Sequence, residues 1–162
     1  MLRSVGSAFL FLLLAAAAGC SSQDDKSPYV EMRGGGFIFN YRIAEATEGF
    51  FVVVLRPLPG GATLEASFEN PAGGEAILVT APASANRDKF DFITPPLKGI
   101  VADKEYRVAL RVLAADGKEL QRIEKKFHSQ VDQSILPEKP LTIGPGYTKN
   151  PDLAPAPGSG AQ

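Results

Sequence analysis

The stretch YRVALRVLAADGKELQRIEKKF, residues 106–127, decides the fold class of this chain. Apolar side chains recur at every second position from Tyr106 to Val112, which is the period of a half-buried strand. Asp116-Gly117 then supplies a tight turn into residues 119–127. Three apolar residues of this second segment also fit a helical spacing, but the Asp-Gly turn behind a strong strand favours a second strand. The stretch therefore predicts a β-hairpin.

Five earlier segments show strand patterns bounded by Gly, Pro and Asn, and they are residues 37–43, 50–55, 63–69, 76–79 and 90–92. The first is expected to turn its aromatic face, including Phe37 and Tyr41, toward the core. The run FFVVVL at 50–55 is continuous and rich in β-branched residues, which predicts a strand buried on both faces. Gly34-Gly35-Gly36 lacks the spacing of a phosphate-binding loop and is interpreted as a hinge. Seven strands in total predict an all-β fold, an antiparallel β-sandwich.

The segment VADKEYRVAL, residues 101–110, resembles a late strand of fibronectin type III and other immunoglobulin-like domains. In those domains a tyrosine at the strand start hydrogen-bonds to the backbone a few residues upstream, and Tyr106 occupies that place. The chain lacks the Trp and the cysteine pair of antibody-type domains. The resemblance implies architecture only, since such sandwiches have many unrelated functions.

The first twenty residues have the plan of a secretory leader. Arg3 precedes an apolar run, residues 9–18, that is too short to cross a bilayer comfortably. Ala17-Ala18-Gly19 then leads into Cys20, the single cysteine, and a polar stretch follows.

This leader resembles the lipobox of bacterial lipoprotein precursors. The resemblance implies cleavage before Cys20, diacylglycerol on its sulfur and an acylated amino terminus. Several acyl chains anchor a protein durably to a membrane. Ser21 behind the cysteine implies the outer membrane, facing the periplasm; an inner-membrane or Gram-positive location stays open. We expect a signal peptide at residues 1–19, a flexible tether at 20–35 and the sandwich at 36–128.

Residues 129–162 form a Pro- and Gly-rich tail, and the last nine residues have no apolar side chain larger than Pro, which predicts disorder. Leu141, Ile143 and Tyr147 are the exception. Docking of these side chains on the sandwich is the favoured interpretation, and binding of a partner protein is the alternative.

Composition excludes several classes of function. With 17 basic and 18 acidic residues the chain has no positive surplus for nucleic acid. One Cys and one His exclude an intrachain disulfide and a zinc site built from these residues, so no metal and no cofactor is expected. His128 has only the adjacent Ser129 beside it, and neighbours on a strand point to opposite faces. We therefore expect no catalytic residue and no enzyme.

The carboxylates are scattered along the chain, Glu45 and Glu48 among them. Glu65 and Glu69 would lie about 13 Å apart on one strand face, which is too far for a shared metal or a retaining glycosidase. Residues 86–91 lack the spacing of a calcium loop. The basic residues of 119–127 fit an edge strand protected against pairing; a rim that meets an acidic partner or anionic lipid is the alternative.

These observations together predict an envelope lipoprotein whose non-catalytic sandwich binds or scaffolds a protein partner. A module for a small ligand or a carbohydrate is the alternative, although the chain has no Trp to form an aromatic platform.

Overall fold

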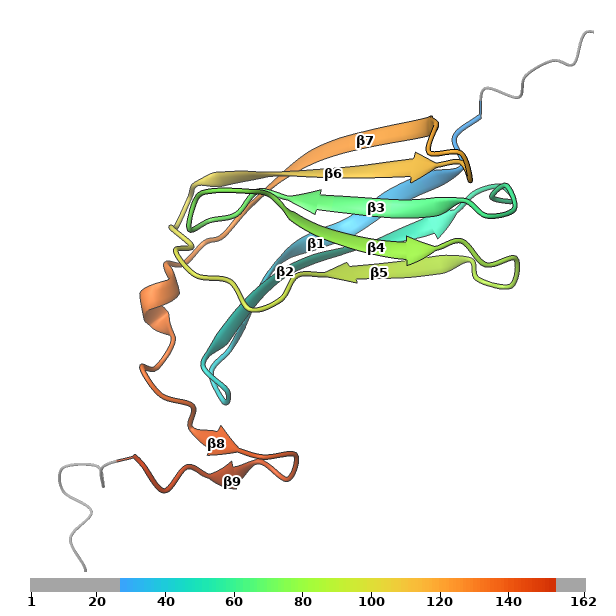
Figure 1. The fold of residues 1–162 in the computed structure, drawn as a ribbon. Helices are drawn as coiled ribbons and strands as arrows, with labels where there is room; N and C mark the ends of the chain where they lie inside the picture. The colour runs from blue at the N-terminus through green and yellow to red at the C-terminus, as the bar shows by residue number, and fades with distance from the viewer. Residues whose placement is uncertain (1–26, 154–162) are drawn as a thin grey trace, which may run out of the picture.

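The computed structural model describes residues 27–153, in which seven strands form two sheets packed face to face (Figure 1). The three-stranded sheet has the order β1-β2-β5 and consists of β1 (Val30–Asn40), β2 (Glu45–Val54) and β5 (Lys89–Ile93). The four-stranded sheet has the order β4-β3-β6-β7 and consists of β3 (Thr63–Phe68), β4 (Ile77–Pro82), β6 (Glu105–Leu113) and β7 (Glu119–His128). All neighbouring strands pair antiparallel. The predicted antiparallel β-sandwich is confirmed. The part of the chain that the structure describes holds no helix of the length and hydropathy needed to span a membrane.

The alternation of apolar residues fills a main core between the sheets. Phe50 lies at its centre, with ring centroids 5.4 Å from both Phe68 and Phe92. Offset and tilted aromatic pairs of this kind add to the free energy gained from burial. The buried members of this cluster are Val30, Met32, Phe50, Val52, Leu64, Ala66, Phe68, Phe90, Phe92, Val108, Leu110 and Val112.

A smaller second cluster lies at one end of the sandwich. Its buried members are Ala46, Leu97, Ile100 and Tyr106, and Phe37, Phe39, Ile77 and Leu136 pack against them. The Tyr106 hydroxyl accepts a hydrogen bond of 2.9 Å from the amide of Val101, which is the contact that the resemblance to immunoglobulin-like domains implies. This bond fixes the end of the connection between β5 and β6.

The first strand begins earlier than the sequence suggests. Val30 and Met32 are only 1% and 2% exposed and belong to the main core, so the tether predicted for residues 20–35 is wrong from Val30 onward. The three glycines are a bulge inside β1, where the pairing register with β2 shifts between Arg33 and Gly36, and not a hinge before the strand. A Cβ on Gly35 would lie 2.3 Å from Cζ of Phe127, so the close approach of β7 explains the glycine.

Two other details differ from prediction. Strand β1 ends at Asn40, so Tyr41 lies in the following turn and is exposed instead of facing the core. On β2, Phe51 and Val53 are half-buried on the outer face, and burial on both faces is therefore wrong. The Lys89 ammonium lies 4.3 Å from the centroid of the Phe51 ring and gives it partial cover.

Side chains of β7 join its open edge to the edge of β1. The Gln121 side chain accepts hydrogen bonds from the amides of Tyr29 and Val30 and donates one to the carbonyl of Val30. The Lys125 ammonium donates to the carbonyl of Met32 at 2.7 Å. These bonds satisfy main-chain groups that an edge strand would otherwise leave open.

The segment after β7 has structure of its own. A short 3₁₀ helix, η1 (Gln133–Ile135), is followed by β8 (Thr142–Ile143) and β9 (Thr148–Lys149). The Gln133 side chain donates to the carbonyl of Leu97 and accepts from the amide of Ile100, and Leu136 packs on the second cluster. The beginning of the predicted tail is therefore attached to the sandwich. The leader with Ala17, Ala18, Gly19 and Cys20, and the last residues, 154–162, lie outside the described residues.

Candidate functional site

The β8–β9 hairpin contains the three residues that the sequence offers as a partner-binding segment. It is held together internally by Asn150, whose side chain is buried. The Asn150 amide donates to the carbonyl of Leu141, its Nδ2 donates to the carbonyl of Pro140, and its Oδ1 accepts from the amide of Asp152. A short hairpin without a core is thus fixed by a polar network.

The hairpin contacts the sandwich through the turn between β1 and β2. The amide and the hydroxyl of Thr142 both donate to the carbonyl of Arg42, at 2.9 and 3.3 Å. The Arg42 guanidinium lies over the ring of Tyr147, 5.4 Å from its centroid. Docking on the chain's own domain occurs, but it uses the amide and hydroxyl of Thr142, the carbonyl of Arg42 and one cation–π contact.

The apolar side chains of the hairpin are not covered by this docking. Leu141, Ile143 and Tyr147 remain 42%, 44% and 54% exposed. Tyr147 also has a positive φ of 51°, which L residues other than Asn and Asp seldom adopt. The structure thus places all three predicted residues in one short hairpin and leaves their side chains exposed.

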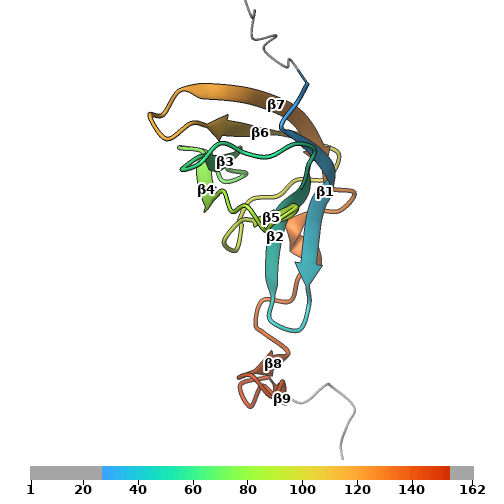
Figure 2. The ribbon, with the colours of Figure 1, turned by 90° about the vertical axis from the view of Figure 1, so that its right-hand side faces the viewer.

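The hairpin lies at the opposite end of the molecule from the start of β1. Figures 1 and 2, which differ by a quarter turn, both place the start of β1 at one end of the sandwich and the β8–β9 hairpin beyond the other end.

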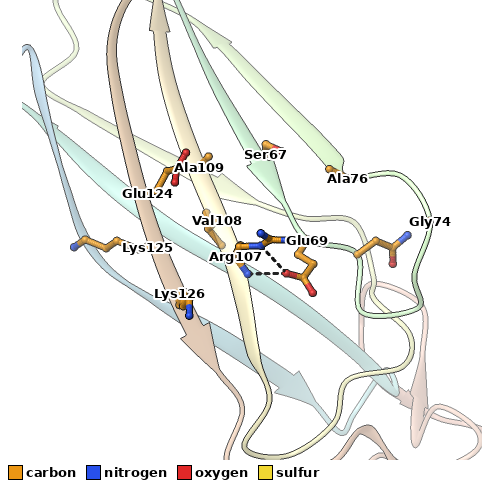
Figure 3. A pocket seen from close by; sticks show the side chains of 11 residues that line it. Ser67, Glu69, Gly74, Ala76, Arg107, Val108, Ala109, Glu124, Lys125 and Lys126 are labelled. Carbon is orange, nitrogen blue, oxygen red and sulfur yellow. Dashed lines mark hydrogen bonds and ion pairs between the residues drawn. The ribbon is translucent and has the colours of Figure 1, made fainter.

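A depression of about 540 Å³ lies on the outer face of the four-stranded sheet (Figure 3). Its floor is made of small residues, Ser67 on β3 and Ala109 on β6, which pair across the strands. Glu69, Arg107 and Glu124 surround them. The Arg107 amide donates to Glu69 and, with the guanidinium 3.5 Å away, lowers the pKa of that carboxyl. The Arg107 side chain is nevertheless 81% exposed.

Strand β7 is an edge of its sheet, as its charge pattern predicts. Its charges are paired with neighbours: Arg122 with Glu119 at 2.8 Å, and Lys126 with Glu105 at 2.7 Å. Exposed pairs of this kind add little stability, so protection of the edge is sufficient reason for them.

The other polar residues considered from the sequence are not assembled into a reactive group. His128 is exposed at the end of β7, while Ser129 is buried and its hydroxyl donates to the carbonyl of Val131 at 2.6 Å. Glu65 forms an ion pair with Arg111, and Asp91 with Lys89. Between residues 27 and 153, no group of three or more His, Cys, Asp or Glu side chains is placed to hold a metal ion.

Glu48 is the unusual residue that the sequence pattern does not single out. It lies on the inner face of β2 between Ala46 and Phe50, is 0% exposed, and neither carboxyl oxygen has a hydrogen-bond partner among the described residues. Burial, with a smaller contribution from the negative charge of Glu69, raises the pKa of Glu48 to about 8. The sequence could have indicated the burial of Glu48 only through the alternation of inward and outward positions along β2, which places Glu48 on the core face.

Comparison of the sequence with protein-family models and with curated proteins found no match. Among solved structures, the chain is similar to OgpA from Akkermansia muciniphila, with a TM-score of 0.40 and 16% identity over 67% of this chain and 29% of that one. The chain is also similar to an endonuclease/exonuclease/phosphatase from Beutenbergia cavernae, with a TM-score of 0.32 and 14% sequence identity. That match covers 59% of this chain and 27% of the other. The chain spans less than a third of the length of either protein. TM-scores this low carry no argument about what the chain does.

Proposed function

We propose that the protein is a lipoprotein of the bacterial envelope, anchored through Cys20, whose sandwich presents the β8–β9 hairpin to a protein partner. The observation that supports this function best is that Leu141, Ile143 and Tyr147 lie in one short hairpin and are all exposed. Several exposed apolar side chains on a hairpin that is fixed by its own polar network are typical of a contact surface.

The arrangement of the two ends supports the same proposal. The described chain enters the sandwich at one end, and the hairpin lies beyond the other (Figures 1 and 2). A lipid on Cys20 would leave the hairpin on the side of the domain that is far from the entry of the tether. The leader AAGC and Ser21 support attachment to the outer membrane with the domain in the periplasm. The proposed role is scaffolding or binding, without a catalytic step.

Photo-crosslinking in intact cells tests the contact. A photoreactive residue at Ile143 should give one discrete crosslinked species, and Leu141→Ser with Tyr147→Ser in the same chain should abolish it. The matched control is the same photoreactive residue at Leu78, which is also apolar, is more exposed than Ile143 (60% against 44%) and lies on β4. Equal crosslinking from Leu78 would contradict the proposal.

The mass of the mature amino terminus tests the anchor. The wild-type chain should begin at a diacylated Cys20, whereas Cys20→Ala should leave the leader uncut or release the protein from membranes, since the chain has no other cysteine. An unmodified cysteine, or a cut elsewhere, would contradict the lipoprotein proposal.

A small-ligand or carbohydrate module is the second candidate, and the depression over Ser67 and Ala109 is the observation that favours it. Its volume lies within the range of ligand pockets, and the exposed guanidinium of Arg107 offers donors. Ligand or glycan that co-purifies with the protein, and is lost with Arg107→Gln, would favour this candidate over protein binding.

A further inference from the structure

Glu48 stands at the border between the two apolar clusters of the sandwich. On the inner face of β2 it follows Ala46 of the second cluster and precedes Phe50 of the main core. Its own backbone is well bonded, because its amide donates to the Thr94 hydroxyl and its carbonyl accepts from the Thr94 amide. The carboxyl group has no such partner among residues 27–153 and no contact with solvent.

The charged and titratable groups around Glu48 cannot neutralise it. Glu69 is the charge that acts on it, and this charge is negative. The nearby cations are engaged elsewhere: Arg107 and Lys104 pair with Glu69, and the Lys104 ammonium also lies 4.7 Å from the Tyr106 ring centroid. Tyr106 is the titratable member of the second cluster, and its hydroxyl accepts from Val101.

Only the neutral carboxyl is compatible with this environment. A buried carboxylate without a cation or a hydrogen-bond donor is strongly destabilised, so an ionised Glu48 requires access to water. Water can reach it most easily through the second cluster, which has four buried members, whereas the main core has twelve and contains the aromatic group around Phe50.

The second cluster also attaches the segment behind β7. Leu136 packs on it, the Gln133 side chain bonds to Leu97 and Ile100, and the Gln133 amide donates to the carbonyl of Ile100 at 2.9 Å. Opening of the cluster would therefore loosen this attachment and with it the base of the segment that continues into the β8–β9 hairpin.

We propose that Glu48 is a proton-controlled latch: the protonated carboxyl keeps the second cluster closed, and its ionisation opens that end of the sandwich and frees residues 133–136. This inference goes beyond the proposed function and does not depend on what the hairpin binds. It also explains why an acidic residue occupies a core position between Ala46 and Phe50, where an apolar residue would give a more stable domain.

The direction of the pH dependence follows from linkage. The closed state keeps its proton up to a pKa of about 8, while an opened state loses it near the usual 4.5. Between these values the closed state binds more protons than the open one, so each unit of rising pH favours opening about tenfold. Above the closed-state pKa the effect levels off.

Amide hydrogen exchange of the full chain, measured by NMR between pH 5 and pH 9, tests the latch. In the wild type, the protection factors of the Leu97 and Gln133 amides should fall about tenfold per pH unit up to about pH 8. In Glu48→Gln, which keeps the shape without the charge, they should not depend on pH. Glu45→Gln is the matched control, because Glu45 lies on the same strand but on its outer face, and this variant should behave as the wild type.

The main core supplies the internal reference. The Leu110 amide, which exchanges through global unfolding, should stay more protected than the Leu97 and Gln133 amides at every pH, although its protection falls with the same slope because the unfolded state also ionises Glu48. Equal protection of Leu97, Gln133 and Leu110 would show that only global unfolding occurs and would overturn the latch, and so would unchanged protection at Leu97 in the wild type. Should Glu48→Gln alter the fold, Glu48→Met fills the same position with an unbranched apolar chain and gives the same readout.

Discussion

The hydroxyl of Tyr106 is a single group on which the end of the sandwich depends. It accepts the Val101 amide from within the second cluster, and its ring makes an edge contact with Phe37 at 5.3 Å. Tyr106→Phe keeps the ring and leaves that amide without its partner, so we expect a loss of about 1 to 3 kcal/mol in the free energy of unfolding. Urea denaturation measures the loss.

Tyr147→Phe is the control for this prediction, because its ring is exposed in the β8–β9 hairpin. It should cost much less than Tyr106→Phe. Equal losses for the two variants would contradict a structural role for the Tyr106 hydroxyl.

Glu48 makes a second prediction at the scale of one residue. Because its pKa is raised from 4.5 to about 8, the folded state holds a proton that the unfolded state has lost, and stability falls as the pH rises between these values. Glu48→Gln should therefore raise the free energy of unfolding by on the order of 3 kcal/mol at pH 7 and by almost nothing at pH 4. Denaturation curves at the two pH values measure the difference, and an equal gain at both would contradict the assigned protonation state.

Among the elements, β1 and β7 depend on each other although they belong to different sheets. Gln121→Ala removes three hydrogen bonds to the main chain of Tyr29 and Val30. We expect a loss of about 2 to 4 kcal/mol, because groups at the start of β1 lose their partners. Exposed Gln130, just beyond β7, gives the matched control, and Gln130→Ala should leave the denaturation midpoint unchanged. A Gln121→Ala variant as stable as this control would show that water replaces the side chain at no cost.

A strand can be predicted from the sequence where its alternation and its flanking turns lie close together in the chain. The strands at Thr63–Phe68 and Glu105–Leu113 alternate regularly, and a turn of Gly, Pro or Asp next to each makes the sequence pattern sufficient. The start of β1 was missed because three glycines interrupt its pattern. The reason for Gly35 lies in Phe127, 92 residues further along the chain, and no local pattern shows such a contact.

Some of the candidate sites can also be recognised from the local sequence, and others depend on contacts between distant segments. Leu141, Ile143 and Tyr147 are recognisable in the sequence because they are the apolar exception in a Pro-rich stretch, and the structure places them in one short hairpin. The depression over Ser67 and Ala109 depends on which small residues meet across β3 and β6, which only the register shows. The burial of Glu48 depends on two clusters formed by five strands, so the sequence indicates it only through the alternation along β2, which places Glu48 on the core face.

At the scale of the whole molecule, the attachment of the C-terminal part decreases stepwise with distance from β7. Residues 129–136 are fixed to the sandwich at four positions. The carbonyl of Ser129 accepts from the Asp103 amide, and the Asp132 carboxylate accepts from the Ala102 amide. The Gln133 side chain donates to the carbonyl of Leu97, and Leu136 packs on the second cluster. The β8–β9 hairpin is joined to the sandwich through Arg42. The hairpin should therefore contribute less to the stability of the sandwich than residues 129–136 do.

Two truncations test this gradation. Deleting residues 138–162 removes the hairpin and should change the free energy of unfolding by less than about 1 kcal/mol, because it breaks only the contacts with Arg42. Deleting residues 129–162 also removes the bonds of Asp132 and Gln133 and uncovers the second cluster at Leu136, and should cost about 2 to 4 kcal/mol more. Urea denaturation of the two truncated chains measures the difference in their free energies of unfolding. If the shorter deletion already costs as much as the longer one, the hairpin is part of the domain's stability, and its exposed side chains cannot be reserved for a partner.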